Sequence, residues 1–461
     1  MRRQILLGLA GIVLIGLVVL LFSSFYGKKP AVTISVGDWP RKNTARRIVY
    51  DHYAAQIRKK HNIVIEPDEW SYSINSFLPK AAVGKLPTIY NTWYTEVQKI
   101  INAGYAVDIT GALQERGWDQ KLSPLVAEII REDDRYYGFP RDAYLIGLMC
   151  NLKLFRAAGL VNTDGVPLFP QTYSELAQMA RIIKEKTGAA GFLLETNGNG
   201  GGWHFMNLAW SYGAEFEREA EGKWQAVFNS PEAVAALQYI KDLRWQDQVL
   251  PDHTLIDWSK AQELIATDQC AMKFEGGFDH NGFDHVVDHY NMAKEDIAMG
   301  RIPAGPGGRV ALLGGNIYMF APNSTKAQID AALEWLRLLG MSPDVSPEGL
   351  QYIEDSYRND FNNGYVVGNV GVPVWTDPEF IAANDNIRAK YVNVEPGNFQ
   401  DYIQAAAVTI RREEPLYCQE LYGVLDGVIQ TVITDPEAEP QRLLDEAARV
   451  FQRDYLDKLN H

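Results

Sequence analysis

The sequence contains little cysteine and no excess of basic residues. Its 461 residues include three cysteines, Cys150, Cys270 and Cys418, and none belongs to a C-x-x-C pair. This spacing argues against a zinc or thiol-redox motif. We expect three buried thiols, although an exported chain could also pair two of them. The formal net charge is −14, and without a basic stripe a nucleic-acid partner is not expected.

The chain also lacks the short motifs of common catalytic sites. It contains no G-x-S-x-G, no H-E-x-x-H and no G-x-x-x-x-G-K. These motifs would supply a hydrolase nucleophile, a zinc-protease site and a phosphate loop, respectively. The glycine run at residues 198–202 lacks the spacing of a dinucleotide-binding fingerprint. We therefore interpret it as a flexible loop beside Trp203.

One polar segment is rich in aspartate and histidine. On a helix, His285 and His289 would share a face, because they are four residues apart. Two imidazoles at this spacing can hold a metal ion, and a histidine can also form a pH-sensitive salt bridge. We favour a plain solvated helix or loop. The segment contains Asp279, His280, Asp284, His285, Asp288 and His289.

The N-terminus has the pattern of an export signal. Arg2 and Arg3 precede an apolar run over residues 5–22, which is near the minimum length for a bilayer-spanning helix. No cysteine follows the run, so a lipoprotein anchor is excluded, and the residues after it make a poor cleavage site. We predict that residues 1–27 are an uncleaved signal anchor, with a cleaved signal peptide as the alternative. Either places the remaining chain outside the cytoplasm, in the periplasm or at the cell surface.

After residue 30, short apolar strands alternate with amphipathic helices. Strands are expected at 32–36, 63–65 and 86–90. Helices are expected at 44–60, at 95–103, after the capping box that begins at Thr172, at Ser230-Pro231, and over 330–339 and 439–459. Alternation of this kind is typical of parallel β-α-β units. The sequence therefore predicts an α/β fold.

Several short phrases follow one another in a recognisable order. They are LPTIY at 86–90, AGYAVDIT at 103–110, YGFP at 137–140, NLKLFRAAGL at 151–160, PQTYSEL at 170–176, NSPEAVAAL at 229–237, DQCAMKFEG at 268–276 and GG at 314–315. In this order they resemble the extracellular solute-binding proteins of carbohydrate ABC transporters, family 1, which includes maltose-binding protein. The resemblance covers nearly all of the chain after residue 30.

The resemblance implies an α/β, two-lobed periplasmic-binding-protein-like fold of type II, with a hinge and an inter-lobe cleft, behind the N-terminal membrane helix. The implied N-lobe comprises residues 31–140 plus 303–345. The implied C-lobe comprises residues 142–300 plus 347–461. The chain would cross between them near 140–142, 301–303 and 341–347. The ligand would lie between the lobes, which close over it.

The resemblance also implies a binding protein and not an enzyme. It would capture a carbohydrate and deliver it to the permease subunits of an ABC importer, with no cofactor and no metal. An oligosaccharide is favoured, because the chain has 11 Trp and 23 Tyr. The main alternative is a binding protein for a non-sugar solute such as a polyamine, a phosphodiester or a peptide. A remote alternative is a carbohydrate-active hydrolase. Such an enzyme needs a pair of carboxyl groups, for which Glu69, Asp142 and Glu275 are candidates.

A sugar presents a CH-rich face and a ring of hydroxyls, so a site for it needs aromatic plates and planar polar groups. Some such residues follow the expected strands, and others stand where the family tends to place ligand contacts. Each tryptophan could instead pack in a core, and Arg141 and Asp142 could pair only with each other. The predicted ligand-binding residues are Asp38, Trp39, Trp70, Asn91, Trp93, Arg141, Asp142, Tyr144, Trp203, Glu275, Gly277, Phe278 and Asn316.

Overall fold

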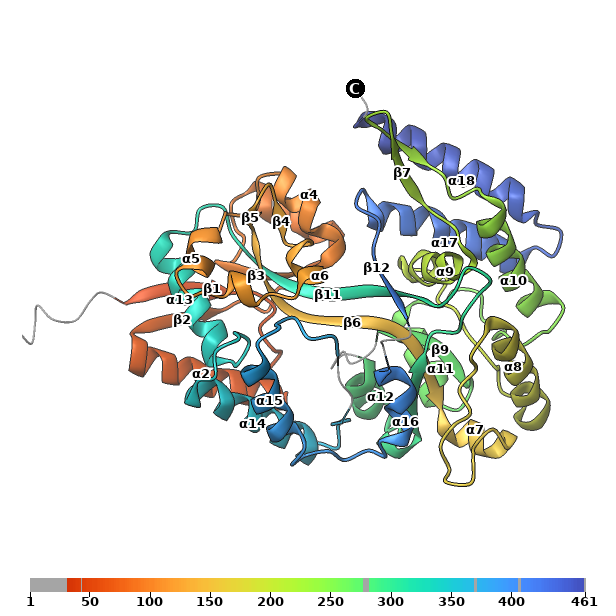
Figure 1. Ribbon diagram of the computed structural model, residues 1–461, viewed down its shortest axis with the longest axis horizontal. Coiled ribbons are helices and arrows are strands. Elements are labelled where there is room, and N and C mark those ends of the chain that lie inside the picture. Colours follow the sequence, from red (N-terminus) through yellow and green to blue (C-terminus); the bar gives the residue numbers. More distant parts are fainter. Residues whose placement is uncertain (1–30, 43, 277–281, 369–370, 405–407, 460–461) are drawn as a thin grey trace, which may run out of the picture.

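The structure, a computed structural model, describes residues 31–42, 44–276, 282–368, 371–404 and 408–459 (Figure 1). The predicted signal anchor lies outside these residues, as do Gly277 and Phe278 of the predicted site. Among the helices that are described, none has both the length and the apolar character needed to cross a bilayer.

The sheet of the first lobe is built from parallel strands and one antiparallel insertion. Strands β1 (Val32–Val36), β2 (Ile63–Pro67) and β3 (Ile89–Trp93) are parallel. Strand β11 (Val310–Phe320) runs antiparallel between β3 and β6 (Gly138–Asn151). The three parallel strands all point their carboxyl ends toward the second lobe, which places the residues that follow them at the lobe contact (Figure 1).

The second lobe continues from the far end of β6. There β6 pairs antiparallel with β9 (Met272–Gly276) and with β10 (Ile297–Arg301), while β12 (Thr409–Arg412) pairs with the first part of β11. A small hairpin of β7 (Glu217–Ala220) and β8 (Lys223–Ala226) lies outside this sheet. The helices of this lobe are α7 (Leu152–Ala158), α8 (Tyr173–Thr187), α9 (Gly200–Tyr212), α10 (Pro231–Trp245), α11 (Trp258–Ala266), α12 (Gly282–Tyr290), α16 (Gly397–Ile403), α17 (Cys418–Thr434) and α18 (Pro440–Asp454).

Helices also cover the first lobe, and most begin at a side-chain cap. Thr44 accepts a hydrogen bond from the Arg47 backbone, and Thr325 forms a full capping box with Gln328. Caps of this kind fix where the chain turns from strand or loop into helix. The elements are α2 (Ala45–His61), α3 (Ile74–Ala82), α4 (Val97–Asn102), α5 (Thr110–Gln114), α6 (Pro124–Ala127), α13 (Lys326–Leu338), α14 (Pro347–Asn362), α15 (Pro378–Arg388) and the short strands β4 (Arg131–Glu132) and β5 (Arg135–Tyr136).

The second crossing between the lobes lies further along the chain than predicted. Residues 297–301 still pair with β6 inside the second lobe, and residues 310–313 pair with β12 there. Only from residue 316 does β11 pair with β3 of the first lobe. Residues 303–313, which were assigned to the N-lobe, therefore belong to the second lobe, because the strand that crosses is β11 and not the loop before it.

The third crossing also differs from the prediction, which placed residues 347–461 in the C-lobe. Helix α14 packs on α2 of the first lobe, where the Tyr53 hydroxyl donates to Asp355 (2.7 Å) and the rings of Tyr53 and Tyr352 lie 4.9 Å apart. Helices α14 and α15 accordingly lie beside α2 in Figure 1. The chain returns to the second lobe before α16, where Asp401 accepts a hydrogen bond from the Arg301 backbone N–H (2.8 Å).

Candidate functional site

A polar network joins five of the predicted residues where β6 and β11 run between the lobes. Asp142 Oδ1 accepts hydrogen bonds from the backbone N–H and the Nδ2 of Asn316, both at 2.9 Å. Asn91 Nδ2 donates to Asn316 Oδ1 (3.5 Å), and Arg141 donates to Asp38 Oδ2 (2.7 Å). All five were predicted as ligand-binding residues, and the network brings their side chains together within and beside β6 and β11.

Asp38 is held in place by its backbone as well as by Arg141. Its φ of 55° lies in the left-handed region, and its backbone N–H donates to the Trp70 carbonyl (2.8 Å). Its other carboxylate oxygen accepts from Ser71 (2.7 Å). The indole of Trp70 points elsewhere, since its Nε1 donates to Ser76 and Lys80 lies over its ring (4.8 Å). Trp70 thus contributes a backbone carbonyl to the network while its ring packs on α3.

Trp39 lies in the core of the first lobe. Its side chain is 2% exposed, its ring stacks on Trp335 at 5.5 Å, and its Nε1 donates to Asp51 (3.1 Å). A ring enclosed in this way is not available to a ligand, which contradicts the predicted role of Trp39 as a ligand contact. The prediction relied on the position of Trp39 shortly after β1, which ends at Val36. In such a loop, neighbouring side chains can point either into the cleft or into the core, and the sequence does not show which.

Aromatic side chains from both lobes gather near the lobe contact. In the first lobe, Trp93 is 37% exposed and lies edge-on to Tyr72, with ring centroids 5.2 Å apart. In the second lobe, Trp203 at the start of α9 lies edge-on to Tyr144 (6.5 Å) and stacks on His204 (5.1 Å). Three predicted residues, Trp93, Tyr144 and Trp203, therefore supply rings to this region.

Two carboxyl groups accompany these rings, and sequence reasoning missed both. Glu96 accepts a hydrogen bond from Tyr72, and burial raises the pKa of Glu96 despite stabilisation of its carboxylate by Tyr72 and Lys99. Burial likewise raises the pKa of Glu413 to about 8, against a hydrogen bond from Tyr422, and the nearby Glu96 adds to the rise. Glu96 follows β3 directly, whereas Glu413 follows β12, a strand that no sequence pattern indicated.

The two lobes contact each other directly through polar side chains. The contacts come from α2, α4 and their neighbours in the first lobe, and from α12 and α17 in the second. They therefore connect the two lobes directly, in addition to the chain crossings. Among the pairs are Arg46 with Asp284 (2.6 Å), Tyr365 with Asp288 (2.6 Å), Lys99 with Glu420 (2.5 Å) and Thr95 with Gln419 (3.0 Å).

Glu275, another predicted residue, belongs to a buried polar cluster in the second lobe. Its carboxylate lies 2.7 Å from Lys273 Nζ and accepts a hydrogen bond from Gln262 (2.6 Å). Glu195 lies behind them, 4.0 Å from the same ammonium group. Burial raises the pKa of Glu195 to about 8, with Lys273 opposing and Glu275 adding to the rise. Glu275 is only 5% exposed, so it supports the site and does not face into it.

The glycine run before Trp203 is part of helix α9 and not the flexible loop that its composition suggested. Helix α9 begins at Gly200, and Gly200, Gly201 and Gly202 are all buried. A Cβ on Gly202 would lie 2.4 Å from the backbone of Tyr422 in α17. Asp426 of α17 accepts hydrogen bonds from the backbone N–H groups of Asn199 (2.7 Å) and Gly202 (2.8 Å). The glycines are therefore needed for close helix packing.

Asp279 and His280 of the aspartate–histidine segment lie outside the described residues, and the other four side chains divide between two faces of helix α12. Asp284 and Asp288 reach the first lobe, whereas His285 and His289 stack on each other with ring centroids 4.0 Å apart and lie against Trp258 of α11. Burial and the neighbouring His289 lower the pKa of His285. Across the described ranges, no group of three or more His, Cys, Asp or Glu side chains is placed to hold a metal. The three cysteines are free and buried.

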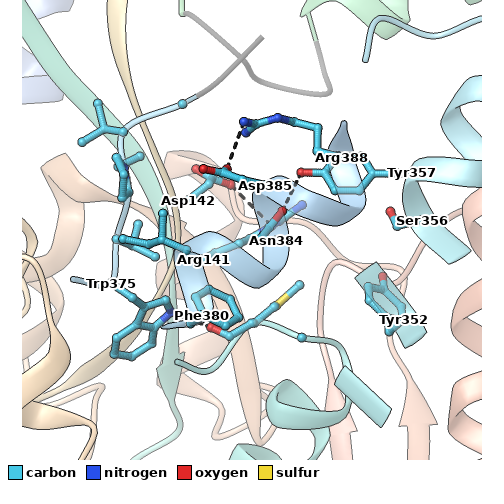
Figure 2. A pocket seen from close by; sticks show the side chains of 18 of the residues that line it. Arg141, Asp142, Tyr352, Ser356, Tyr357, Trp375, Phe380, Asn384, Asp385 and Arg388 are labelled. Atoms are coloured by element: carbon cyan, nitrogen blue, oxygen red, sulfur yellow. Dashed lines mark hydrogen bonds and ion pairs between the residues drawn. The ribbon is translucent and has the colours of Figure 1, made fainter. Parts of the chain in front are cut away.

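A cavity of about 370 Å³ opens beside the polar network (Figure 2). Arg141 and Asp142 form one wall, and α14 and α15 form the others. Figure 2 shows two pairs on one side of the space: Arg388 with Asp385 (an ion pair), and Tyr357, whose hydroxyl donates to Asn384. The lining comprises Arg46, Val49, Tyr50, Arg141, Asp142, Ala143, Gly340, Met341, Tyr352, Ser356, Tyr357, Asn359, Gly371, Val372, Pro373, Val374, Trp375, Phe380, Ile381, Asn384, Asp385 and Arg388.

Two α/β lobes, joined by three chain crossings and lined with aromatic and polar groups where they meet, define the class of hinged solute-binding proteins. Residues 40–340 match the family described as bacterial extracellular solute-binding protein, and the chain belongs to that family. The expected resemblance and the two-lobed fold are thus confirmed.

Solved structures of similar fold cover nearly the whole chain. The GacH receptor of Streptomyces glaucescens, solved with acarbose, is 18% identical, with 92% of this chain and 98% of that chain covered and a TM-score of 0.64. The cyclic alpha-maltosyl-1,6-maltose binding protein of Arthrobacter globiformis is 21% identical, with 92% and 98% covered and a TM-score of 0.64. UgpB of Mycobacterium tuberculosis, solved with glycerophosphocholine, is 13% identical, with 94% and 100% covered and a TM-score of 0.69.

Proposed function

We propose that this protein is the extracytoplasmic solute-binding component of an ABC import system. It captures a carbohydrate between its lobes and delivers it unchanged to the permease subunits of the transporter. Residues 1–27 tether it to the membrane in this proposal. Family membership supports the solute-binding role, and the ligands of GacH and of the Arthrobacter globiformis protein support the choice of a carbohydrate.

The observation that carries the carbohydrate proposal is the gathering of aromatic rings and polar groups from both lobes at the lobe contact. Trp93 comes from the first lobe, where the buried Glu96, 2% exposed, holds Tyr72 beside it. Trp203 with Glu413 comes from the second lobe. Aromatic faces cover the CH-rich side of a sugar ring, while carboxyl groups bind its hydroxyls. Closure of the hinge brings the two halves together, so a ligand ring between them is held from both sides.

The charges around the cavity favour a neutral solute over a phosphodiester. Its three guanidinium groups are already paired: Arg46 with Asp284, Arg141 with Asp38, and Arg388 with Asp385 (2.9 Å). Because each arginine has a carboxylate partner, little positive field remains for an anion such as glycerophosphocholine's phosphate. A ligand with many hydroxyls can bind such paired groups without separating them.

The test is calorimetric titration of the purified protein with mono- and oligosaccharides, with a polyamine, a short peptide and glycerophosphocholine as competing classes. We expect binding to sugars alone, and recovery of the sugar unchanged after incubation. Trp93→Ala and Trp203→Ala should each weaken binding about tenfold or more, since stacking on an aromatic ring contributes about 1–3 kcal/mol. Phe361→Ala, an exposed aromatic on α14, is the matched control and should leave affinity unchanged. Binding of a competing class in place of sugars would refute the proposal.

A further inference from the structure

The last turn of α2 carries a cluster of basic side chains on a protein that is acidic as a whole. The cluster, named here the basic end of α2, comprises Arg58, Lys59, Lys60 and His61, and all four residues are exposed. Basic residues in the last turn also stabilise a helix through its dipole. Because the formal net charge of the chain is −14, the cluster is nevertheless a local exception to the field around the molecule.

The protein neutralises only part of this cluster itself. Glu348 lies 3.5 Å from Lys60, and Glu334 lies 3.4 Å from the imidazole of the cluster. Within the described part of the chain, Arg58 and Lys59 have no ion-pair partner. Exposed cations in this state remain available to an anion outside the protein.

The described chain begins directly beside the basic end of α2. The Val32 backbone N–H at the start of β1 donates to the carbonyl of Asn62 (3.2 Å), the residue that follows the cluster. Val32 also pairs with Ile63 in the β1–β2 register. In Figure 1, β1 begins at the outer end of the first lobe, away from the second lobe. The segment that leads from the proposed membrane anchor therefore enters the fold next to the basic end of α2.

The length of the chain limits the distance between this entry point and the bilayer. The apolar run ends at residue 22, so the nine residues 23–31 connect it to β1. Nine residues span at most roughly 30 Å, and two of them, Lys28 and Lys29, are basic. A short tether keeps the lobe at a high effective concentration near the surface, so even a weak electrostatic contact with the surface is populated.

We propose that the basic end of α2 docks on the anionic headgroups of the bilayer that holds the anchor. This inference rests on the membrane tether in the proposed function and not on the identity of the solute. Anionic lipid is the partner because its phosphate groups accept bidentate hydrogen bonds from arginine and its surface potential attracts basic side chains close to the membrane. The same surface repels the acidic remainder of the protein. The first lobe therefore faces the bilayer, and the second lobe lies farthest from it.

The test measures how close each lobe of the full chain lies to the bilayer. The protein is reconstituted into vesicles of phosphatidylcholine alone, or of a roughly two-to-one mixture of phosphatidylcholine and phosphatidylglycerol, with an acceptor dye on a lipid. A donor dye is attached to Ala55→Cys on α2 or, in a second preparation, to Ala235→Cys on α10. Both positions are exposed, and the three native cysteines are buried, so the dye reacts with the introduced thiol.

Energy transfer from position 55 should be higher in the anionic vesicles than in the neutral ones, whereas transfer from position 235 should not rise. Arg58→Gln combined with Lys59→Gln should lower the ratio of docked to undocked lobe by about tenfold or more, since each basic residue near an anionic leaflet changes this ratio by about fivefold. Molar salt should act in the same direction, because it shortens the Debye length to about 3 Å.

The matched control combines Arg442→Gln with Arg449→Gln, which removes two exposed charges from α18 in the second lobe and should leave the transfer from position 55 unchanged. Thermal unfolding of each variant establishes that it is folded.

Each outcome bears on a particular part of the proposal. Equal transfer from position 55 in the two kinds of vesicle, or a wild-type response from the α2 double variant, overturns the docking surface and leaves the tether intact. An equally large effect of the α18 double variant also overturns it, since net charge alone would then be the cause. Transfer that rises with the density of protein in the membrane, and not with lipid charge, would make a second copy of the chain the partner in place of lipid. If vesicles of neither composition retain the full chain, the tether fails, and the docking surface fails with it.

Discussion

Glu195→Gln should stabilise the protein, by an amount that grows as the pH rises. In the unfolded chain the carboxyl of Glu195 ionises with its ordinary pKa of 4.5, whereas burial in the second lobe raises that pKa to about 8. Between these two values the folded protein binds a proton that the unfolded chain has lost. The free energy of unfolding therefore falls as the pH rises through this window. Glutamine has no proton to lose, so the substitution removes this loss.

The size of the effect follows from the gap between the two pKa values. Each pKa unit corresponds to about 1.4 kcal/mol. At pH 5 the gain should be below about 1 kcal/mol, and at pH 7 it should be roughly 3 kcal/mol. The gain levels off above the folded-state pKa of about 8, because both states are then ionised.

The assay is urea unfolding, followed by tryptophan fluorescence, of the wild-type protein and the variant at pH 5, 7 and 8. Glu185→Gln is the control, because the Glu185 side chain is 77% exposed and its replacement should change stability little at any pH. A gain from Glu195→Gln that is the same at all three pH values would refute the reasoning. So would a loss of stability at pH 8, which would show that the Glu195 carboxylate is ionised and stabilised by Lys273.

Three further substitutions test the packing described above. Trp39→Ala should lower the free energy of unfolding by about 3–5 kcal/mol in urea unfolding and leave the ranking of sugar affinities unchanged, since Trp39 is a core residue; an altered ranking with little loss of stability would place it in the site. Gly202→Ala should destabilise the folded protein by more than about 2 kcal/mol, because its Cβ would meet the Tyr422 backbone at 2.4 Å; wild-type stability in the same assay would contradict this packing. Asp284→Asn removes the charge that pairs with Arg46, so small-angle scattering should show a larger radius of gyration without ligand; an unchanged radius would mean that this pair does not hold the lobes closed.

Much of the fold could be predicted from the sequence, because local patterns decide it. The expected strand at 32–36 is β1 with the same bounds, and the expected helix at 44–60 is α2 at Ala45–His61. Caps and apolar periodicity act over a few residues, so a single sequence reveals them. The lobe boundaries depend on which distant segments pair. The assignment of 347–388 to the wrong lobe shows that local patterns do not carry this information.

The candidate site was predicted in part, for a related reason. Asp38 follows a strand that the patterns indicated, and Arg141 was selected because the resemblance implies a lobe crossing at 140–142; strand β6, which contains Arg141, was not predicted. The prediction for Trp39 was wrong because the direction of one side chain after a strand depends on the packing of its neighbours. Glu413 was missed because β12 has no sequence signature, and because the nearby carboxyl group of Glu96 belongs to the other lobe and is far away in the sequence.

Strand β6 gives the molecule a mechanical property beyond its role in positioning the site. Its residues 138–145 pair with β11, and pairing with β9 begins at the next residue, Ile146, so a rotation of the lobes must be absorbed as torsion of strand backbone that is paired along its length. Gly314 and Gly315 lie alongside, packed so tightly that a Cβ on either would come within 2.7 Å of Tyr144 or Asp142. A strand that is hydrogen-bonded at both ends and tightly packed in between favours two discrete angles between the lobes over a continuous range of angles. A permease in the membrane would then meet one of two distinct shapes, and not a gradually closing one.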